Sequence, residues 1–244
     1  AALSCALFTV TADSDGIYRN YPLLYIYKDL VLPTLALQAY QFATNEELEV
    51  SLDGNGIRSI KGQGLEIEAQ NQLFINFPKE IPSVSASDVL TGAVSPNYFV
   101  DKIVLIGLSE IGLYDIRPTN LNPYTPGVHL HAAALSNLLQ SNWIQHHPLG
   151  SMMITLGSIL TLILLARVAK DMRIRWFLYL LYFLLVISLS TVYLYQANVA
   201  LHLFEVLLFS LMCLGLIEGR NQLAVHNRYR SVKSAFSAYV VPEV

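Results

Sequence analysis

The chain has 244 residues, of which 54% are hydrophobic and 14% charged, with a net charge of −3 and a mean hydropathy of +0.45. No nucleic-acid partner is expected for this slightly acidic chain. Residues 1–147 hold seven Lys and Arg against 14 Asp and Glu, whereas residues 148–244 hold eight against four. The first part therefore has the composition of a soluble domain, and three long apolar runs in the second part explain the positive hydropathy.

The first part of the chain begins with strand patterns. An apolar run predicts a buried strand over 3–10, and a turn followed by a strand or hairpin is expected over 12–28. Helical spacing predicts a helix over 32–43, with Pro33 suited to its first turn. Short strands separated by Gly-rich turns are expected over 49–78.

Three further elements complete this part. The sequence predicts a short helix with a serine cap over 85–92, a buried strand ending at a glycine over 101–107, and a helix over 126–140. Together these patterns predict an α/β domain over residues 1–147, and a domain of about 140 residues is long enough to bury its own core.

The second part contains apolar runs over 149–166, 176–195 and 197–217. Each has about the ~20 residues that a bilayer-spanning helix needs, and the first two contain no charged residue. Soluble helices would show a polar stripe, which these runs lack. The sequence therefore predicts three transmembrane helices within residues 148–217 and a lipid bilayer as a partner.

Basic residues predict the orientation of these helices. The loop 167–175 holds four Lys and Arg, and the segment 218–244 holds another four, whereas the loop near Gln196 has none. The positive-inside rule then places 167–175 and 218–244 in the cytoplasm and residues 1–147 outside it. Glu205, an acid near the outer end of the third run, is expected to snorkel to the interface rather than to line an ion path.

Candidate nucleotide and calcium loops in the first part are weak. The stretch KIVLIGLSEIG (102–112) joins a strand pattern to a glycine but lacks both GxGxxG and GxxxxGK[ST]. DSDG (13–16) and DGNG (53–56) match turn signals better than an EF-hand loop, which would need a glutamate at its twelfth position.

The two histidines His129 and His131 could share a metal, but packing is the favoured interpretation because no cysteine or acid is placed beside them. No Ser/His/Asp, Cys/His or paired-carboxylate set is present in the sequence pattern. Residues 1–147 are therefore expected to form a binding module without a catalytic site, a metal or a cofactor.

The last segment carries a heptad pattern. Apolar and aromatic residues are spaced four, three, four and three apart, as in the seam of a coiled coil: Val225, Tyr229, Val232, Phe236 and Tyr239. The alternative is a solvated juxtamembrane helix attracted to anionic lipid.

Five segments of the first part occur in the order and spacing of one family: DSDGIYRNYPLL, LFINFP, SASDVLTG, DKIVLIGLSEIGLYDIRPT and PGVHLHAAALSNLL. On these motifs, residues 1–145 resemble the second type of CHASE sensor domain, an extracellular module associated with cyclases and histidine kinases. The resemblance implies an α/β extracytoplasmic sensor domain, three transmembrane α-helices and a short cytoplasmic signalling helix. It also implies one further span before Ala1, so the N-terminus is expected to be truncated.

The motif positions implied by the resemblance are expected to be mostly structural or signal-sensing. They are Asp13, Asp15, Gly16, Arg19, Asn76, Phe77, Asp88, Gly92, Gly107, Gly112, Asp115, Pro126, Gly127, His131 and Ala132. His129 departs from the family pattern.

The closing residues FSAYVVPEV resemble the segment that leads into class III nucleotide cyclase domains. The resemblance implies the input half of a homodimeric receptor adenylate or guanylate cyclase in a bacterial inner membrane, sensing an unknown small-molecule or protein signal. ATP and Mg would then be used only by a catalytic domain outside this chain. The alternatives are the input region of a sensor kinase and a stand-alone membrane-anchored binding or scaffold protein.

Overall fold

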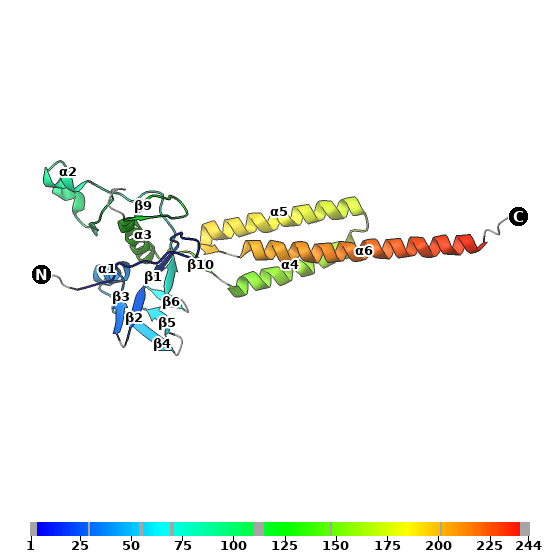
Figure 1. The fold of residues 1–244 in the computed structure, drawn as a ribbon, viewed down its shortest axis with the longest axis horizontal. Helices are drawn as coiled ribbons and strands as arrows, with labels where there is room; N and C mark the ends of the chain where they lie inside the picture. Colours follow the sequence, from blue (N-terminus) through cyan, green and yellow to red (C-terminus); the bar gives the residue numbers. More distant parts are fainter. Residues whose placement is uncertain are drawn as a thin grey trace. The chain divides into compact units, whose positions relative to one another are not determined.

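The computed structural model describes residues 4–28, 30–53, 56–68, 71–109, 115–146, 148–200 and 202–239 (Figure 1). The chain divides into two compact units, Ala1–Ile144 and Gln145–Val244, which we call unit 1 and unit 2. The division falls close to the predicted boundary at residue 147. Each unit is described by itself.

Unit 1 is built from short antiparallel strand pairs and helices. The strand pairs are β1 (Asn20–Pro22) with β7 (Gln72–Phe74), β2 (Leu24–Tyr27) with β3 (Leu30–Pro33), β4 (Glu49–Asp53) with β5 (Gly56–Lys61), β5 with β6 (Glu66–Glu68), and β8 (Ile116–Arg117) with β9 (Thr125–Pro126). The helices are α1 (Leu35–Thr44), α2 (Ala86–Leu90), the 3₁₀ helix η1 (Pro96–Phe99) and α3 (Gly127–Gln140).

The core of unit 1 lies between α1, α3 and the strands β1, β5 and β7. Its fully buried large side chains are Tyr21, Leu23, Leu37, Ile60, Leu65, Leu73, Ile75, Leu130 and Leu138. The alternating residues of the strands and the i, i+3, i+4 positions of the two helices supply these side chains, which is the pattern of a half-buried sheet covered by amphipathic helices. By contrast, the residues around α2 and η1 are largely exposed.

Several predicted elements of unit 1 are confirmed. Four strands, β4 to β7, lie within 49–78, and α3 lies within 126–140. The helix predicted over 85–92 forms as α2, and its Ser85 side chain accepts a hydrogen bond from the amide of Ser87, as the predicted serine cap requires. The predicted helix over 32–43 forms as α1, but Pro33 ends β3 instead of entering the first helical turn.

Two predicted buried strands are wrong. Residues 4–10 make only one isolated parallel bridge, from Leu7 to Thr34. Residues 102–109 have no regular secondary structure, and Ile106 is 94% exposed. An apolar, β-branched run forms a strand only where a neighbouring strand accepts its backbone hydrogen bonds, and the small sheets of unit 1 do not take up either segment.

Unit 2 consists of three long helices and one short strand pair. The helices are α4 (Pro148–Val168), α5 (Met172–Ala197) and α6 (Leu203–Tyr239), and β10 (Gln145–His146) pairs in parallel with β11 (Val199–Ala200). Leu162, Tyr179 and Leu214, one from each helix, are buried together where the three helices pack. The α5 helix begins at the cap Asp171, whose carboxylate accepts from two backbone amides.

Two helices of unit 2, Leu149–Val168 and Met172–Ala197, are long and apolar enough to cross a membrane. They correspond to the first two predicted spans. The third predicted span differs from the structure, because residues 199–200 form β11 and the helix starts only at Leu203. From there α6 continues without a break to Tyr239, so the third apolar run and the predicted cytoplasmic helix are parts of one helix that extends beyond α4 and α5 (Figure 1).

Candidate functional site

The first motif segment forms a turn closed by an ion cluster. The Arg19 guanidinium donates to Asp13 Oδ2 at 3.2 Å and contacts both carboxylate oxygens of Asp15, at 3.0 and 2.8 Å. Gly16 occupies the turn with a φ of 81°, which favours glycine. The hydrogen bonds from Arg19 and then from the Ile17 amide lower the pKa of Asp15 to about 2. Because Arg19 already neutralises these carboxylates, the cluster fits a structural turn better than a calcium loop.

His131 lies in the core of unit 1. Its Nδ1 is 2.7 Å from the Tyr21 hydroxyl, whose oxygen accepts a hydrogen bond from the Ala36 amide. The Ala36 amide fills one acceptor site of this hydroxyl, and the tautomer of His131 decides which of the two groups donates in the contact with Nδ1. Burial lowers the pKa of His131, opposed by the negative charge of Asp115 and assisted by the positive charge of Arg117.

His129 is half-buried, and burial also lowers its pKa. In the part of the chain that the structure describes, no three His, Cys, Asp or Glu side chains gather as a metal site would require. The packing role expected for His131 agrees with its contacts, and the absence of a bound metal stays a prediction.

Glycines let the loops approach the start of α3. A Cβ on Gly127 would lie closer than 3.0 Å to the side-chain carboxylate of Asp115. The backbone carbonyl of Asp115 accepts a hydrogen bond from the Gly127 backbone amide at 2.9 Å. A Cβ on Gly107 would come equally close to the Val128 side chain. Both motif glycines are thus explained by close approach to α3, which follows directly after the motif residue Pro126.

Other motif positions make contacts or turns within unit 1. The side-chain amide of Asn137 in α3 accepts a hydrogen bond from the Asn76 backbone N–H and donates one to the Asn76 carbonyl. Phe77 packs against the core. Gly92 follows α2 with a φ of 75°. Three motif residues remain: Asp88 lies in α2, Ala132 lies in α3, and Gly112 is outside the described residues.

A hollow of about 450 Å³ lies on the surface of unit 1, beside the end of the first motif segment. It is lined by Pro22, Leu24, Tyr25, Ile26, Gly56, Ile57, Asn71 and Gln72. Backbone edges and apolar side chains dominate this lining, and it contains no ionisable group other than the Tyr25 phenol. The hollow brings no catalytic groups together.

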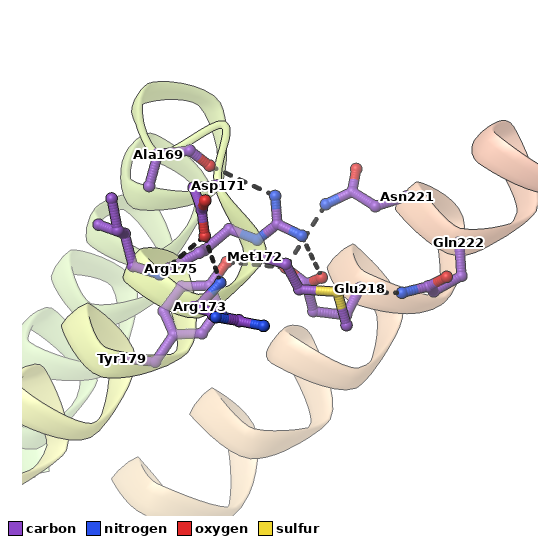
Figure 2. A network of polar contacts seen from close by, with 10 residues as sticks. Ala169, Asp171, Met172, Arg173, Arg175, Tyr179, Glu218, Asn221 and Gln222 are labelled. Atoms are coloured by element: carbon purple, nitrogen blue, oxygen red, sulfur yellow. Dashed lines mark hydrogen bonds and ion pairs between the residues drawn. The ribbon is translucent and has the colours of Figure 1, made fainter.

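A buried ion pair links two helices of unit 2 and was missed by the sequence reasoning. The Arg175 Nη2 group donates to Glu218 Oε2 at 2.8 Å, and the Tyr179 hydroxyl donates to Glu218 Oε1 at 3.0 Å (Figure 2). Arg175 Nη1 also donates to the Ala169 carbonyl between α4 and α5 at 3.3 Å. Arg175 is 9% exposed and Glu218 is 8% exposed, so the pair is shielded from solvent.

The heptad residues lie on the part of α6 that extends beyond the other two helices (Figure 1). Val225 is 65% exposed, and Tyr229, Val232 and Phe236 are similarly exposed. The side chain of Tyr239 is outside the described residues. An exposed apolar stripe on a continuous helix is the surface that a coiled-coil seam requires.

The comparisons with known proteins give one result. The family model of the CHASE2 domain matches residues 1–168, which covers more than half of the chain and includes all five motif segments. Neither the search of curated proteins nor the search of solved structures found a match.

The family match extends past unit 1 through α4, so the first apolar helix belongs to the matched region. The turn of Asp13 to Arg19, the buried His131 and the close-approach glycines all lie within the matched residues. The CHASE2 domain is an extracellular sensor domain, and the chain belongs to the CHASE2 family.

Proposed function

We propose that the chain is the sensory input and transmembrane signalling region of a receptor adenylate or guanylate cyclase. Unit 1 detects an extracytoplasmic signal, the helices of unit 2 carry the change across a bacterial inner membrane, and a dimeric class III cyclase domain outside this chain responds. The observation that carries this proposal is the continuity of α6, which joins an apolar first half to an exposed heptad stripe in one helix.

The charges of unit 2 support a topology with three spans. Lys170 lies between α4 and α5, and Arg173 lies in the first turn of α5. A second basic group follows the apolar part of α6: Arg220, Arg228 and Arg230. The positive-inside rule places both groups on the cytoplasmic side, which requires the first half of α6 to be the third span. Glu205 is exposed at the other end of that half, where its carboxylate reaches the outer interface.

The heptad stripe supports a homodimer. Class III cyclase sites form between two catalytic domains, so a parallel pair of α6 helices would position the two domains relative to one another. Signal binding then acts by a population shift between two arrangements of the pair, for which a differential interaction of about 1–3 kcal/mol suffices. Two tyrosine positions in the seam weaken the pairing, which suits a switch.

No ATP or Mg site is proposed in this chain, since both would be used by the catalytic domain. The signal is a small molecule or a protein that contacts unit 1, for which the hollow beside β2 is one candidate place. A kinase output is the second candidate, and the likeness of residues 236–244 to a cyclase-linked segment favours the cyclase.

The test joins the chain at Val244 to the catalytic domain of a class III cyclase and measures cyclic-nucleotide synthesis in membranes. Val232→Asp with Phe236→Asp should abolish synthesis, because two acids in the seam would separate the helices. The matched control, Asn227→Asp with Ser234→Asp, adds the same charge on the opposite side of α6 and should leave synthesis intact. Equal activity of both double variants would refute the proposed relay.

A further inference from the structure

The heptad spacing of α6 extends towards the N-terminus beyond Val225, the first apolar residue of the stripe. The alternating spacing of the seam continues backwards from Val225 to Gln222 and from there to Glu218, in steps of three and four residues. All these positions therefore lie along one side of the helix, which drifts only about 20° per heptad. The first heptad of the seam is polar, whereas the later ones are apolar and aromatic.

This polar heptad contacts α5 of the same chain. Glu218 is held by Arg175 and Tyr179, and Gln222 Nε2 lies 3.9 Å from the Met172 sulfur (Figure 2). Glu218 is 8% exposed, whereas Val225, one heptad further along the same side, is 65% exposed. The start of α5 thus covers Glu218 and lies beside the exposed Gln222, on the side of α6 that from Val225 onward is open to a second copy.

We propose that the Arg175–Glu218 pair is a latch that sets where the dimer seam begins. It holds the first heptad on α5 and leaves the helix from Val225 onward for the second copy. This inference rests on the proposed function, because it assumes that α6 pairs with its copy through the heptad stripe.

The charge of Glu218 lets the latch act on the seam in both of its states: the closed latch permits pairing, and the open latch opposes it. In a parallel pair, equal heptad positions of the two helices face each other, so two Glu218 carboxylates released from their arginines would meet and repel. With the latch closed, each carboxylate is neutralised within its own chain and the seam from Val225 onward can pair. A shift of α5 that withdraws Arg175 would therefore loosen the seam at its first turn.

One unsatisfied donor of Arg175 favours opening of the latch. The Nε group of Arg175 is buried but has no hydrogen-bond partner in the described part of the chain. A buried guanidinium with one unsatisfied donor is held less firmly than a fully bonded one. Through Nη1 the same side chain is bonded to the Ala169 carbonyl, so movement of the connection between α4 and α5 acts directly on the pair.

Disulfide crosslinking in membranes tests the latch on the full 244-residue chain, with Cys5→Ser and Cys213→Ala to remove the two free thiols. Val225→Cys and Val232→Cys should crosslink between copies, and Gln222→Cys should not. Replacing both partners, with Arg175→Leu and Glu218→Leu, should raise crosslinking at Gln222→Cys to the level of Val225→Cys. Arg175→Leu alone should instead lower crosslinking at Val225→Cys.

The outcomes separate the two proposals. If Gln222→Cys crosslinks as well as Val225→Cys while both charges are present, the latch is refuted and the seam stands. If neither Val225→Cys nor Val232→Cys crosslinks, the seam itself is refuted, and the latch with it. Because Arg175→Leu alone could misfold, Arg175→Lys serves as the second variant, and it should retain crosslinking at Val225→Cys.

Discussion

Replacing Arg175 by leucine should strongly destabilise unit 2. Among the described residues, the substitution leaves Glu218, which is 8% exposed, with the Tyr179 hydroxyl as a close hydrogen-bond donor and with the Asn221 side-chain amide at 3.5 Å. Removing one partner of a buried ion pair costs about 3–5 kcal/mol, because the other charge stays buried without compensation.

A smaller effect would follow if the pair behaved like an ordinary polar contact between membrane helices, which contributes about 0.6 kcal/mol on average. We expect the larger value, since both groups are charged and both are shielded. Replacing both partners by leucine removes the uncompensated charge and should be nearly neutral, within about 1–2 kcal/mol of the unmodified chain.

The assay is reversible unfolding of the chain in mixed micelles by increasing denaturing detergent. Trp176, which directly follows Arg175 and stacks edge-on against Tyr179 at 5.9 Å, reports on unit 2 by fluorescence in a Trp143→Phe background. The unmodified chain, Arg175→Leu, Glu218→Leu and the double variant form a double-mutant cycle that isolates the energy of the pair. The reasoning would be refuted if Arg175→Leu and the double variant both lowered the unfolding free energy by the same small amount.

Two further predictions concern unit 1, with Trp143 as the reporter in a Trp176→Phe background. Burial lowers the pKa of His131 below its ordinary value of 6.5, so its neutral form stabilises the fold above pH 6.5 and this stability is lost as the pH falls from 6.5 through the folded-state pKa. The unfolding free energy should therefore drop as the pH falls below about 6.5, and a His131→Gln variant should reduce this slope to the part that His129 contributes; an unchanged slope would contradict the role of His131. Gly127→Ala should cost about 1–3 kcal/mol, because the added methyl group meets the Asp115 carboxylate, and Asp115→Ala should recover most of the loss; an equal loss with and without Asp115 would rule out this clash as the cause.

Sequence patterns were sufficient where structure is decided locally. The helix after Pro126 and Gly127 and the two apolar helices of unit 2 follow from start signals, spacing and the absence of charge. The runs 3–10 and 101–107 have strand composition, but strand formation depends on a partner elsewhere in the chain, which composition does not specify.

The Arg175–Glu218 pair could not be seen in a local pattern, because its partners are 43 residues apart. Arg175 lies in the predicted basic loop, and such a loop indicates membrane orientation without indicating which arginine is buried. One signal was present: Glu218 lies seven residues before Val225, so extending the heptad backwards would have placed an acid in the seam and raised the question of its partner.

The most direct test of the account is the sidedness of the two ends of the chain. Single cysteines at Ser14 in unit 1 and at Ser231 in α6 are labelled with a membrane-impermeant reagent in intact spheroplasts and in inverted vesicles, in the background free of Cys5 and Cys213. The account predicts labelling of Ser14→Cys from outside and of Ser231→Cys from the cytoplasmic side only, because the proposed topology makes α6 the third span. Labelling of both positions from the same side would mean that only α4 and α5 cross the membrane, and would contradict a signalling helix that leads from an outer sensor to a cytoplasmic cyclase.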